Sequence, residues 1–325
     1  STIILPNTAC TPVAVSVHPV NATVCSGNTA TFNVTATGSS PTYQWQVSTD
    51  GINYTDITGA TAATLTLTNV TTTMSGNKYR VVVSNTCPSV ATSNAATLTV
   101  NPGVSVTTQP TAATVCAGGT ATLSATAAGT SPTYQWQVST DGGTTFTNIA
   151  GATTNTLTLT GVTAAMNNNQ YHLLVSNACP SNATSSNVTL TVQSAPSITT
   201  QPAAAVTCSG TTATYTVVAT GTNITYQWQT AATCALPFSN ITGATSATLN
   251  VPNVTAAMSG TAYRVVVSGV CTPSSVTSNC VTLTVNNTTT ITAQPASTAV
   301  CAVVPVTFTA TATGSAITYQ WQVST

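Results

Sequence analysis

Short runs in which apolar residues return at every second position cover most of the chain. The segments 32–36 and 79–83 read Phe-Asn-Val-Thr-Ala and Tyr-Arg-Val-Val-Val. A period of two is that of a β-strand with one buried face, and no segment shows the 3.6-residue period of an amphipathic helix. The pattern predicts an all-β protein. The residues expected to face its core on these two strands are Phe32, Val34, Ala36, Tyr79, Val81 and Val83.

The alternating runs recur at a spacing of one small domain. Four tryptophans stand in the same Tyr-Gln-Trp-Gln segment, and each follows a cysteine by 20 residues: Trp45, Trp136, Trp228 and Trp321 after Cys25, Cys116, Cys208 and Cys301. Turn residues separate about seven strands per repeat, which is typical of a β-sandwich. We therefore expect an N-terminal segment 1–12, complete domains at 13–101, 102–193 and 194–286, and a partial fourth domain at 287–325, called repeats 1 to 4 below.

The sequence of the repeats resembles that of a known fold family. The segment Val24-Cys25-Ser26-Gly27, Trp45 eleven residues after Val34, and Tyr79 at the start of the sixth strand are similar to the intermediate-type immunoglobulin fold. Over nearly the full chain the sequence resembles the immunoglobulin-like (Ig-like) repeats of large surface proteins of Bacteroidota. The resemblance implies extracellular proteins that often serve adhesion or gliding, and it implies no particular chemistry.

The chain departs from antibody-type domains and from its own repeat at two places. Val34 and Val81 stand where an antibody-type domain has its two core cysteines, and Ala302-Val303 interrupts the Cys-x-Gly turn in repeat 4. Any disulfides must therefore lie elsewhere than in the usual core bridge.

Charge is almost absent. The chain holds three Lys+Arg and three Asp+Glu, which argues against nucleic-acid binding and against a polybasic membrane contact. The sequence contains no run of eighteen apolar residues, so we expect no insertion into a membrane. An uncharged, Thr-rich surface favours association, so we expect self-association into a fibre.

Ten cysteines without a CxxC motif or a Cys/His cluster predict disulfides formed in an oxidising compartment. Strand direction opposes a bridge inside each repeat. The second and sixth strands run the same way, so Cys25, before the second, and Cys87, after the sixth, lie at opposite ends of the sandwich, tens of ångströms apart against a Cα limit of about 7 Å.

Residues at opposite ends of one domain become neighbours across a joint between domains. We therefore expect bridges Cys25–Cys179 and Cys116–Cys271, with Cys10–Cys87 at the entrance of repeat 1 and a local pair Cys234–Cys280 in repeat 3. Cys208 and Cys301 are left to find partners beyond residue 325. One internal bridge per repeat on flexible joints, such as Cys25–Cys87, remains the alternative.

The sequence offers no catalytic or cofactor site. His18 and His172 lie in different repeats without a carboxylate or nucleophile in register, so we expect no enzyme. Asp50, Asp56 and Asp141 are too few for calcium sites, and no metal or cofactor is expected. All aromatic residues, including the recurring Tyr54, Phe146 and Phe238, are assigned to core positions. The outward cations Arg80, His172 and Arg264 are interpreted as solvated.

The favoured function is structural: the stalk or filament of an extracellular bacterial surface fibre or adhesin at the cell surface, stiffened by disulfides between domains. The alternative is an adhesive or carbohydrate-binding module of a larger secreted protein, for which the divergent loop 230–237 of repeat 3 is the candidate. Repeat 4 is expected to be completed by further repeats of the same polypeptide, or by residues Ile3 to Leu5 of a second copy acting as a donated strand.

The pairing can be tested by mass spectrometry of a digest made without reductant, using a protease that cuts at apolar residues. We expect linked peptides that join Cys10 to Cys87, Cys25 to Cys179 and Cys116 to Cys271, because strand direction brings these ends together. A peptide that joins Cys25 to Cys87 would contradict both the pairing and the stiffened joints.

Overall fold

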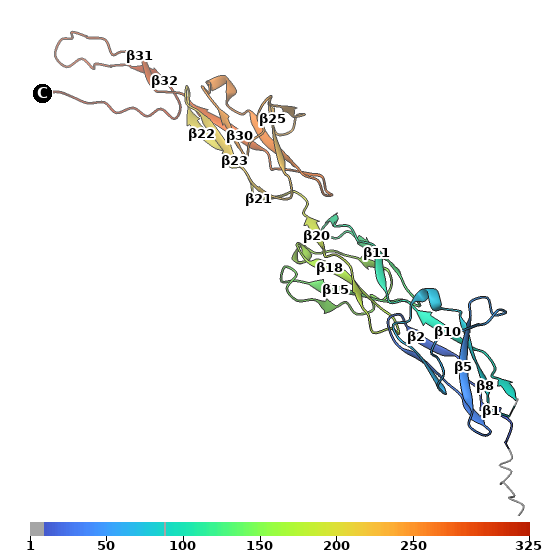
Figure 1. The fold of residues 1–325 in the computed structure, drawn as a ribbon. Coiled ribbons are helices and arrows are strands. Elements are labelled where there is room, and N and C mark those ends of the chain that lie inside the picture. Colours follow the sequence, from blue (N-terminus) through green and yellow to red (C-terminus); the bar gives the residue numbers. More distant parts are fainter. Residues whose placement is uncertain (1–9, 88) are drawn as a thin grey trace, which may run out of the picture. The chain divides into compact units, whose positions relative to one another are not determined.

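The computed structural model describes residues 10–87 and 89–325, and each of repeats 1 to 3 is a sandwich of two β-layers (Figure 1). In repeat 1 the larger layer has the strand order β2-β10-β8-β5-β6, with β9 also paired to β8. Its strands are β2 (Ala22–Cys25), β5 (Thr42–Ser48), β6 (Thr55–Asp56), β8 (Lys78–Ser84), β9 (Val90–Thr92) and β10 (Ala96–Asn101). The smaller layer consists of β1 (Ala14–Val17) on β4 (Thr35–Thr37) and β3 (Ala30–Asn33) on β7 (Thr64–Leu67). The expectation of an all-β sandwich is confirmed.

The next two repeats follow the same order of strands. Repeat 2 comprises β11 (Ser105–Thr108), β12 (Ala113–Cys116), β13 (Ala121–Ser124), β14 (Thr126–Ala128), β15 (Thr133–Ser139), β16 (Thr147–Asn148), β17 (Thr156–Leu159), β18 (Gln170–Ser176), β19 (Ala183–Thr184) and β20 (Val188–Gln193). Repeat 3 comprises β21 (Ser197–Thr200), β22 (Ala205–Cys208), β23 (Ala213–Thr216), β24 (Val218–Thr220), β25 (Thr225–Ala231), β26 (Ser239–Asn240), β27 (Thr248–Val251), β28 (Ala262–Ser268), β29 (Ser275–Thr277) and β30 (Val281–Asn286). Three-residue 3-10 turns, η1 (Thr72–Met74), η2 (Ala164–Met166) and η3 (Ala256–Met258), precede β8, β18 and β28.

The core lies between the two layers and is built by the expected alternation. Phe32, Tyr79, Val81 and Val83 are at most 2% exposed, and Ala36 packs partly buried against them. Trp45 is fully buried, and its indole N–H donates to the Ala62 carbonyl over 2.9 Å. Because the polar end of each core tryptophan is satisfied in this way, the ring can be buried without an unpaired donor.

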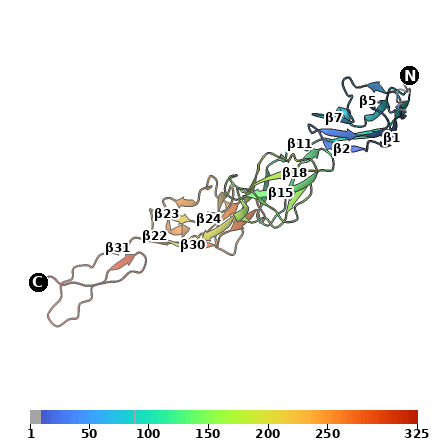
Figure 2. The ribbon, with the colours of Figure 1, turned by 60° about the horizontal axis from the view of Figure 1, so that its bottom comes forward.

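A parallel strand pair sets the direction of the joints. β2 runs parallel to β10, with Cys25 opposite Asn101, and β22 runs parallel to β30, with Cys208 opposite Asn286. The pair β22 and β30 lies side by side in both ribbon views (Figures 1 and 2). The first cysteine of each repeat therefore lies at the end from which the chain leaves that repeat.

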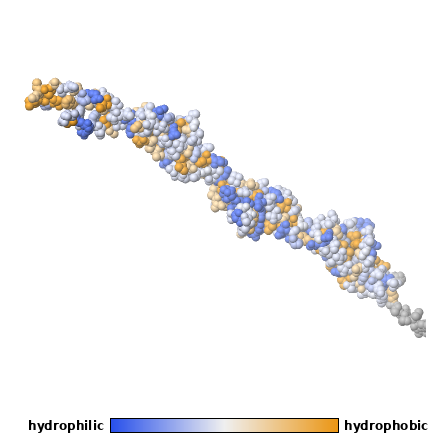
Figure 3. Space-filling view, turned by 60° about the vertical axis from the view of Figure 1, so that its left-hand side comes forward, coloured by the Kyte–Doolittle hydropathy of each residue, from blue (hydrophilic) through white to orange (hydrophobic). Residues whose placement is uncertain are grey.

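Repeat 4 is present only as β31 (Thr290–Ala293) paired with β32 (Thr311–Thr313). Its Phe308 and Trp321 are 50% and 52% exposed, whereas the equivalent Phe32 and Trp45 are 1% and 0% exposed. Orange, apolar atoms accordingly gather over this C-terminal segment (Figure 3). The side chains that fill the core of the other repeats thus face solvent here.

Val303 shows why the Cys-x-Gly turn favours glycine. Gly27, Gly118 and Gly210 have φ angles of 85°, 84° and 86°, and Val303 at the same position has φ 65°. A β-branched residue in the left-handed region is strained, because its Cβ approaches the backbone. The sequence departs from the repeat here, but the backbone keeps the same positive-φ turn.

No helix in the described part of the chain is long and apolar enough to cross a membrane.

Tyr215 carries an unusual polar group in the core of repeat 3. Its side chain is 1% exposed and its hydroxyl has no hydrogen-bond partner among the described residues. Burial raises the pKa of Tyr215 to about 12. The equivalent position in repeat 1 holds Phe32, which is buried to the same extent.

We expect Tyr215→Phe to stabilise repeat 3 by about 1 to 3 kcal/mol, the usual cost of a buried polar group without a partner. Chemical denaturation of the chain with and without the substitution measures the difference. Tyr79→Phe is the matched control: burial raises the pKa of Tyr79, but its hydroxyl has a hydrogen-bond partner in the Asn77 side chain, which opposes that shift. An equal or lower stability of Tyr215→Phe would show that its hydroxyl has an undetected partner.

Candidate functional site

Four disulfides join residues at the ends of the repeats. Cys25 is bridged to Cys179 and Cys116 to Cys271, with Cα atoms 5.6 and 5.7 Å apart. Cys10 is bridged to Cys87 and Cys234 to Cys280, at 5.7 and 5.9 Å. Strand direction was the reason to expect the two bridges between repeats and Cys10–Cys87, whereas Cys234–Cys280 was expected as a local pair of repeat 3. All four Cα separations are normal for a disulfide. Two of the bridges therefore tie one repeat to the next.

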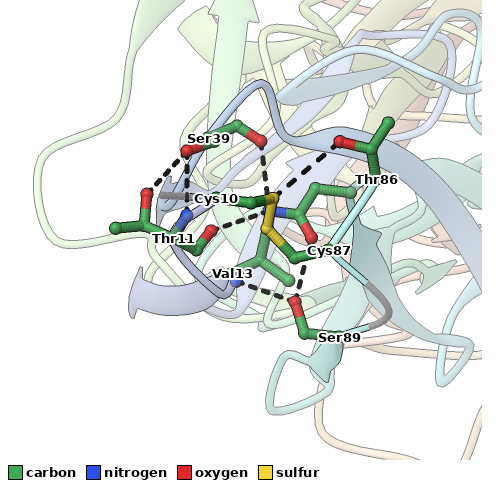
Figure 4. Close-up of a disulfide and its surroundings, with 8 residues drawn as sticks. Cys10, Thr11, Val13, Ser39, Thr86, Cys87 and Ser89 are labelled. Atoms are coloured by element: carbon green, nitrogen blue, oxygen red, sulfur yellow. Dashed lines mark hydrogen bonds between the residues drawn. A yellow bond between two sulfur atoms is a disulfide. The ribbon is translucent and has the colours of Figure 1, made fainter. Parts of the chain in front are cut away.

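The entrance of repeat 1 is held by more than its disulfide (Figure 4). The Thr11 N–H donates to the Ser39 hydroxyl over 3.0 Å, and the Val13 N–H donates to the Ser89 hydroxyl over 3.1 Å. The Asn85 amide donates to the carbonyls of Thr11 and Ser39. The loop after β8 is thus hydrogen-bonded to the backbone that precedes β1.

Asn177 repeats this arrangement at the entrance of repeat 2. Its amide donates to the carbonyls of Pro102 and Thr130 over 3.1 and 3.2 Å, and its Oδ1 accepts from the Cys179 N–H over 3.0 Å. Cys179 is 3% exposed, and its Sγ lies 3.7 Å from the Asn101 carbonyl oxygen. The linker, the loop and the bridge to Cys25 therefore form one joint.

The joint in front of repeat 3 differs in its side chains. Gly269 stands where repeats 1 and 2 have Asn85 and Asn177, and a Cβ on it would lie 3.0 Å from the Pro196 ring. Cys271 is 2% exposed and receives Cys116, the last residue of β12. In this joint, close packing of Gly269 on Pro196 thus replaces the hydrogen bonds that the asparagine makes to linker carbonyls in the other two. Sequence reasoning missed the asparagines, although their common position before the cysteine was a signal.

Cys208 and Cys301 are exposed and unbridged in the described part of the chain. Cys208 ends β22, as Cys25 ends β2. It therefore occupies the position from which the two bridges between repeats start.

Arg80, His172 and Arg264 each lie against an aromatic ring on the outer face of the larger layer, which corrects the interpretation that these cations are simply solvated. The Arg80 guanidinium lies 3.8 Å from the Tyr54 ring centroid, and its Nε donates to the side-chain Oε1 of Gln46 over 2.9 Å. The Gln46 amide donates to Asp56 over 2.8 Å. Tyr54 thus lies on the outer face over Arg80 and not in the core, because β6 places it on the same side as Asp56.

The same arrangement recurs in the other repeats with different residues. Arg264 lies 4.1 Å from the Phe238 ring and donates to Gln229, which donates to Asn240. In repeat 2 the buried His172 stacks on Phe146, with centroids 3.9 Å apart, and its ring nitrogens contact Gln137 and Asn187. The assignment of Tyr54, Phe146 and Phe238 to the core is therefore wrong. The alternation alone does not show on which layer face a residue after a hairpin lies.

His18 has a structural partner. Its Nδ1 accepts from the Asn94 N–H over 3.0 Å. Gln109 and Gln201 accept from Ser186 and Asn279 N–H groups at the equivalent places, over 2.7 and 2.8 Å. His18 therefore does in repeat 1 what a glutamine carbonyl does in the other two.

The carboxylates of the hairpins are occupied by their own turns. Asp50 accepts from the backbone N–H groups of Ile52 and Asn53, which hold the pKa of its carboxyl well below the usual range. Asp141 accepts from the Ser139 hydroxyl and from Thr145, with the same effect on its pKa. In the ranges 10–87 and 89–325, no three His, Cys, Asp or Glu side chains gather as metal ligands would.

Comparisons with known proteins agree on the class. An I-band fragment of titin is similar with a TM-score of 0.61 and 17% identity, over 84% of this chain and 98% of the fragment. A three-domain titin structure with a Glu-to-Ala variant has a TM-score of 0.60 and 18% identity, over 85% of this chain and 99% of that one. These likenesses show the fold: the chain is a tandem array of Ig-like domains.

The array belongs to the family described as Domain of unknown function (DUF8696), whose model matches residues 14–102, 105–194 and 197–287. Endoglucanase C of Cellulomonas fimi is 37% identical over 177 residues. The match covers 54% of this chain and 16% of that relative's length. Four disulfides and tandem Ig-like domains are those of a modular extracellular or secreted protein.

We expect a calcium chelator to leave the melting temperature of the chain unchanged, because Asp50 and Asp141 already bind their own hairpins. Differential scanning calorimetry with EDTA, and again after added calcium, measures this. A drop of several degrees in EDTA that calcium reverses would reveal an ion site.

Proposed function

We propose that the chain is a non-catalytic segment of an extracellular fibre or adhesin stalk at the cell surface, and that its disulfides carry tension from one repeat to the next. The single observation behind the proposal is the overlap of the bridges. Each of the bridges Cys25–Cys179 and Cys116–Cys271 begins in one repeat and ends in the next, and the two enclose overlapping stretches of chain.

Two of the bridges create a short covalent path. From Cys10 it crosses to Cys87, follows the chain to Cys116, and crosses to Cys271. Fully extended, this path measures roughly 100 Å, against roughly 900 Å for the unbridged chain between the same two cysteines. Tension therefore bypasses most of the residues in repeats 1 to 3 and falls on residues 87–116, so that between Cys10 and Cys271 pulling can extract only the strands β9 to β12.

The composition suits a stalk that must persist outside the cell. Calcium would need carboxylates, which are scarce here, so covalent bridges and neutral amides serve at the joints. Three Lys and Arg residues leave trypsin-like proteases few places to cut. We further propose that β-strands from additional repeats, or from a second copy, cover Phe308 and Trp321. The donated strand considered from the sequence, Ile3 to Leu5, lies outside the described residues.

Stretching of single molecules by their two ends tests the proposal. We expect the segment between Cys10 and Cys271 to reach a length of no more than roughly 100 Å in the oxidised chain and roughly 900 Å with reductant. The variant Cys116→Ala/Cys271→Ala should gain roughly 270 Å, because the shortest path then runs through the Cys25–Cys179 bridge.

The pair Cys234→Ala/Cys280→Ala is the matched control. It also removes one disulfide, but the covalent path does not pass through that bridge, so the extension should not change. An oxidised chain that extends as far as the reduced one would refute the tension path.

A second candidate function is supported by the likeness to Endoglucanase C of Cellulomonas fimi. Its name denotes an enzyme that cuts glucan chains, and Ig-like repeats beside such an enzyme could serve as carbohydrate-binding modules. In repeat 3, residues 232–237 are all exposed, and the loop is tied to β30 by the Cys234–Cys280 bridge. This loop would be the contact surface.

Sedimentation with insoluble cellulose discriminates between the candidates. Depletion of the chain from the supernatant, and its reversal in Leu236→Asp, would favour the binding module. A chain that stays in solution favours the stalk.

A further inference from the structure

Each smaller layer ends in a strand with a bare edge. In repeat 1, β7 pairs with β3 and with no other strand among the described residues. In Ig-type sandwiches a fourth strand usually covers this edge. Here residues 57–62 form turns, with Ala60 bonded to Ile57 and to the Trp45 N–H, and supply no such strand.

The direction of the hydrogen bonds shows which groups are free. The Val34 N–H donates to the Ala63 carbonyl, and Phe32 lies opposite Leu65 in the same register. Because bonding alternates along an antiparallel pair, the N–H and C=O groups of Thr64 and Thr66 point away from β3. No hydrogen bond to those backbone groups is found within the described part of the chain.

The same edge recurs in the other two repeats. Val217 bonds to Ala247, which turns the backbone of Thr248 and Asn250 outward on β27. Ala125 bonds to Asn155, which turns Thr158 outward on β17. In β17 the Thr156 carbonyl alone has a partner, the Thr154 hydroxyl at 2.7 Å.

A groove follows each edge. It has a volume of about 330 Å³ in repeat 1 and about 260 Å³ in repeats 2 and 3. One wall is the edge strand and the other is the turn 57–62, or its equivalents 149–154 and 241–246. The walls contain Thr, Ala and Gly but no charge. Proteins usually protect such edges with lysine, proline or a bulge, and these strands have none.

We propose that the bare edges of β7, β17 and β27 are the surfaces through which a second copy of this chain pairs by adding strand to strand. The inference deepens the proposed function, since it names the contact by which stalks associate laterally. The partner is a second copy because the edge complements itself.

Antiparallel pairing of two β7 strands about Leu65 shows the complementarity. It places Thr64 opposite Thr66 of the other copy on both sides of a two-fold axis, so that every free N–H meets a free C=O in four hydrogen bonds. The scarcity of charge leaves no like-charge repulsion to oppose the approach.

The triple variant Thr66→Pro, Thr158→Pro, Asn250→Pro tests the surface in the full chain. Each substitution removes an N–H that points away from the existing pair, a position where proline is tolerated in edge strands. The matched control, with serine at the same three positions, keeps the N–H groups. Sedimentation velocity over a concentration series should show that the parent and serine chains associate. The dissociation constant of the proline chain should be at least roughly tenfold higher.

A second variant keeps the test decisive if proline disturbs folding. Lysine at the same three positions retains the N–H groups and adds repulsion, so association should fall at low salt and return at high salt. A parent chain that stays monomeric up to its solubility limit, or proline and lysine chains that associate like the parent, would overturn the inference. Stretching of single molecules does not depend on association, so this failure is distinguishable from failure of the stalk.

Discussion

The bridge from the last residue of one strand to a loop of the next repeat is the constraint on which the array depends. It exists because β2 runs parallel to β10, which brings Cys25 to the end of the sandwich where the chain leaves. The entering repeat presents at the same end the loop that follows its β18, with Cys179 buried in it. The joint is thereby a consequence of strand direction. The same geometry excludes a bridge of the Cys25–Cys87 type inside one repeat, and it is why the closed loops overlap.

Neutral amides carry most of the contacts that ion pairs carry in other extracellular proteins. Asn85 and Asn177 bind linker carbonyls, and Gln46 connects Arg80 to Asp56. The amide-to-carbonyl contacts of Asn85 and Asn177 change little with salt or pH, because neither an amide nor a backbone carbonyl is charged. Where repeat 2 substitutes His172 for an arginine, the ring keeps the stack on an aromatic residue and the bond to a glutamine.

The fold covers one surface of each sandwich with its own side chains and leaves another open. The outer face of the larger layer is covered by its own stacks of aromatic and cationic side chains, as in Arg264 on Phe238. What the fold leaves open is the edge of the smaller layer, where backbone groups of Thr64 and Thr66 have no partner within the described residues. Backbone groups pair with any strand of suitable shape, so this edge is suited to association between copies more than to recognition of a particular ligand.

The sequence by itself determined the sandwich and the inward positions of its regular strands, because period-two alternation follows from local strand geometry. The regular spacing of Trp45, Trp136 and Trp228 determined the number of complete repeats. Strand direction in that fold was enough to select Cys25–Cys179 over Cys25–Cys87. The positions of Tyr54, Phe146 and Phe238 were decided by the tertiary structure, since a residue after a hairpin takes its face from the register of β6 with β5. The sequence likewise did not predict the bare edge of β7. Residues 57–62 have the composition of an ordinary loop, and only their hydrogen bonds in the structure show that they supply no strand to this edge.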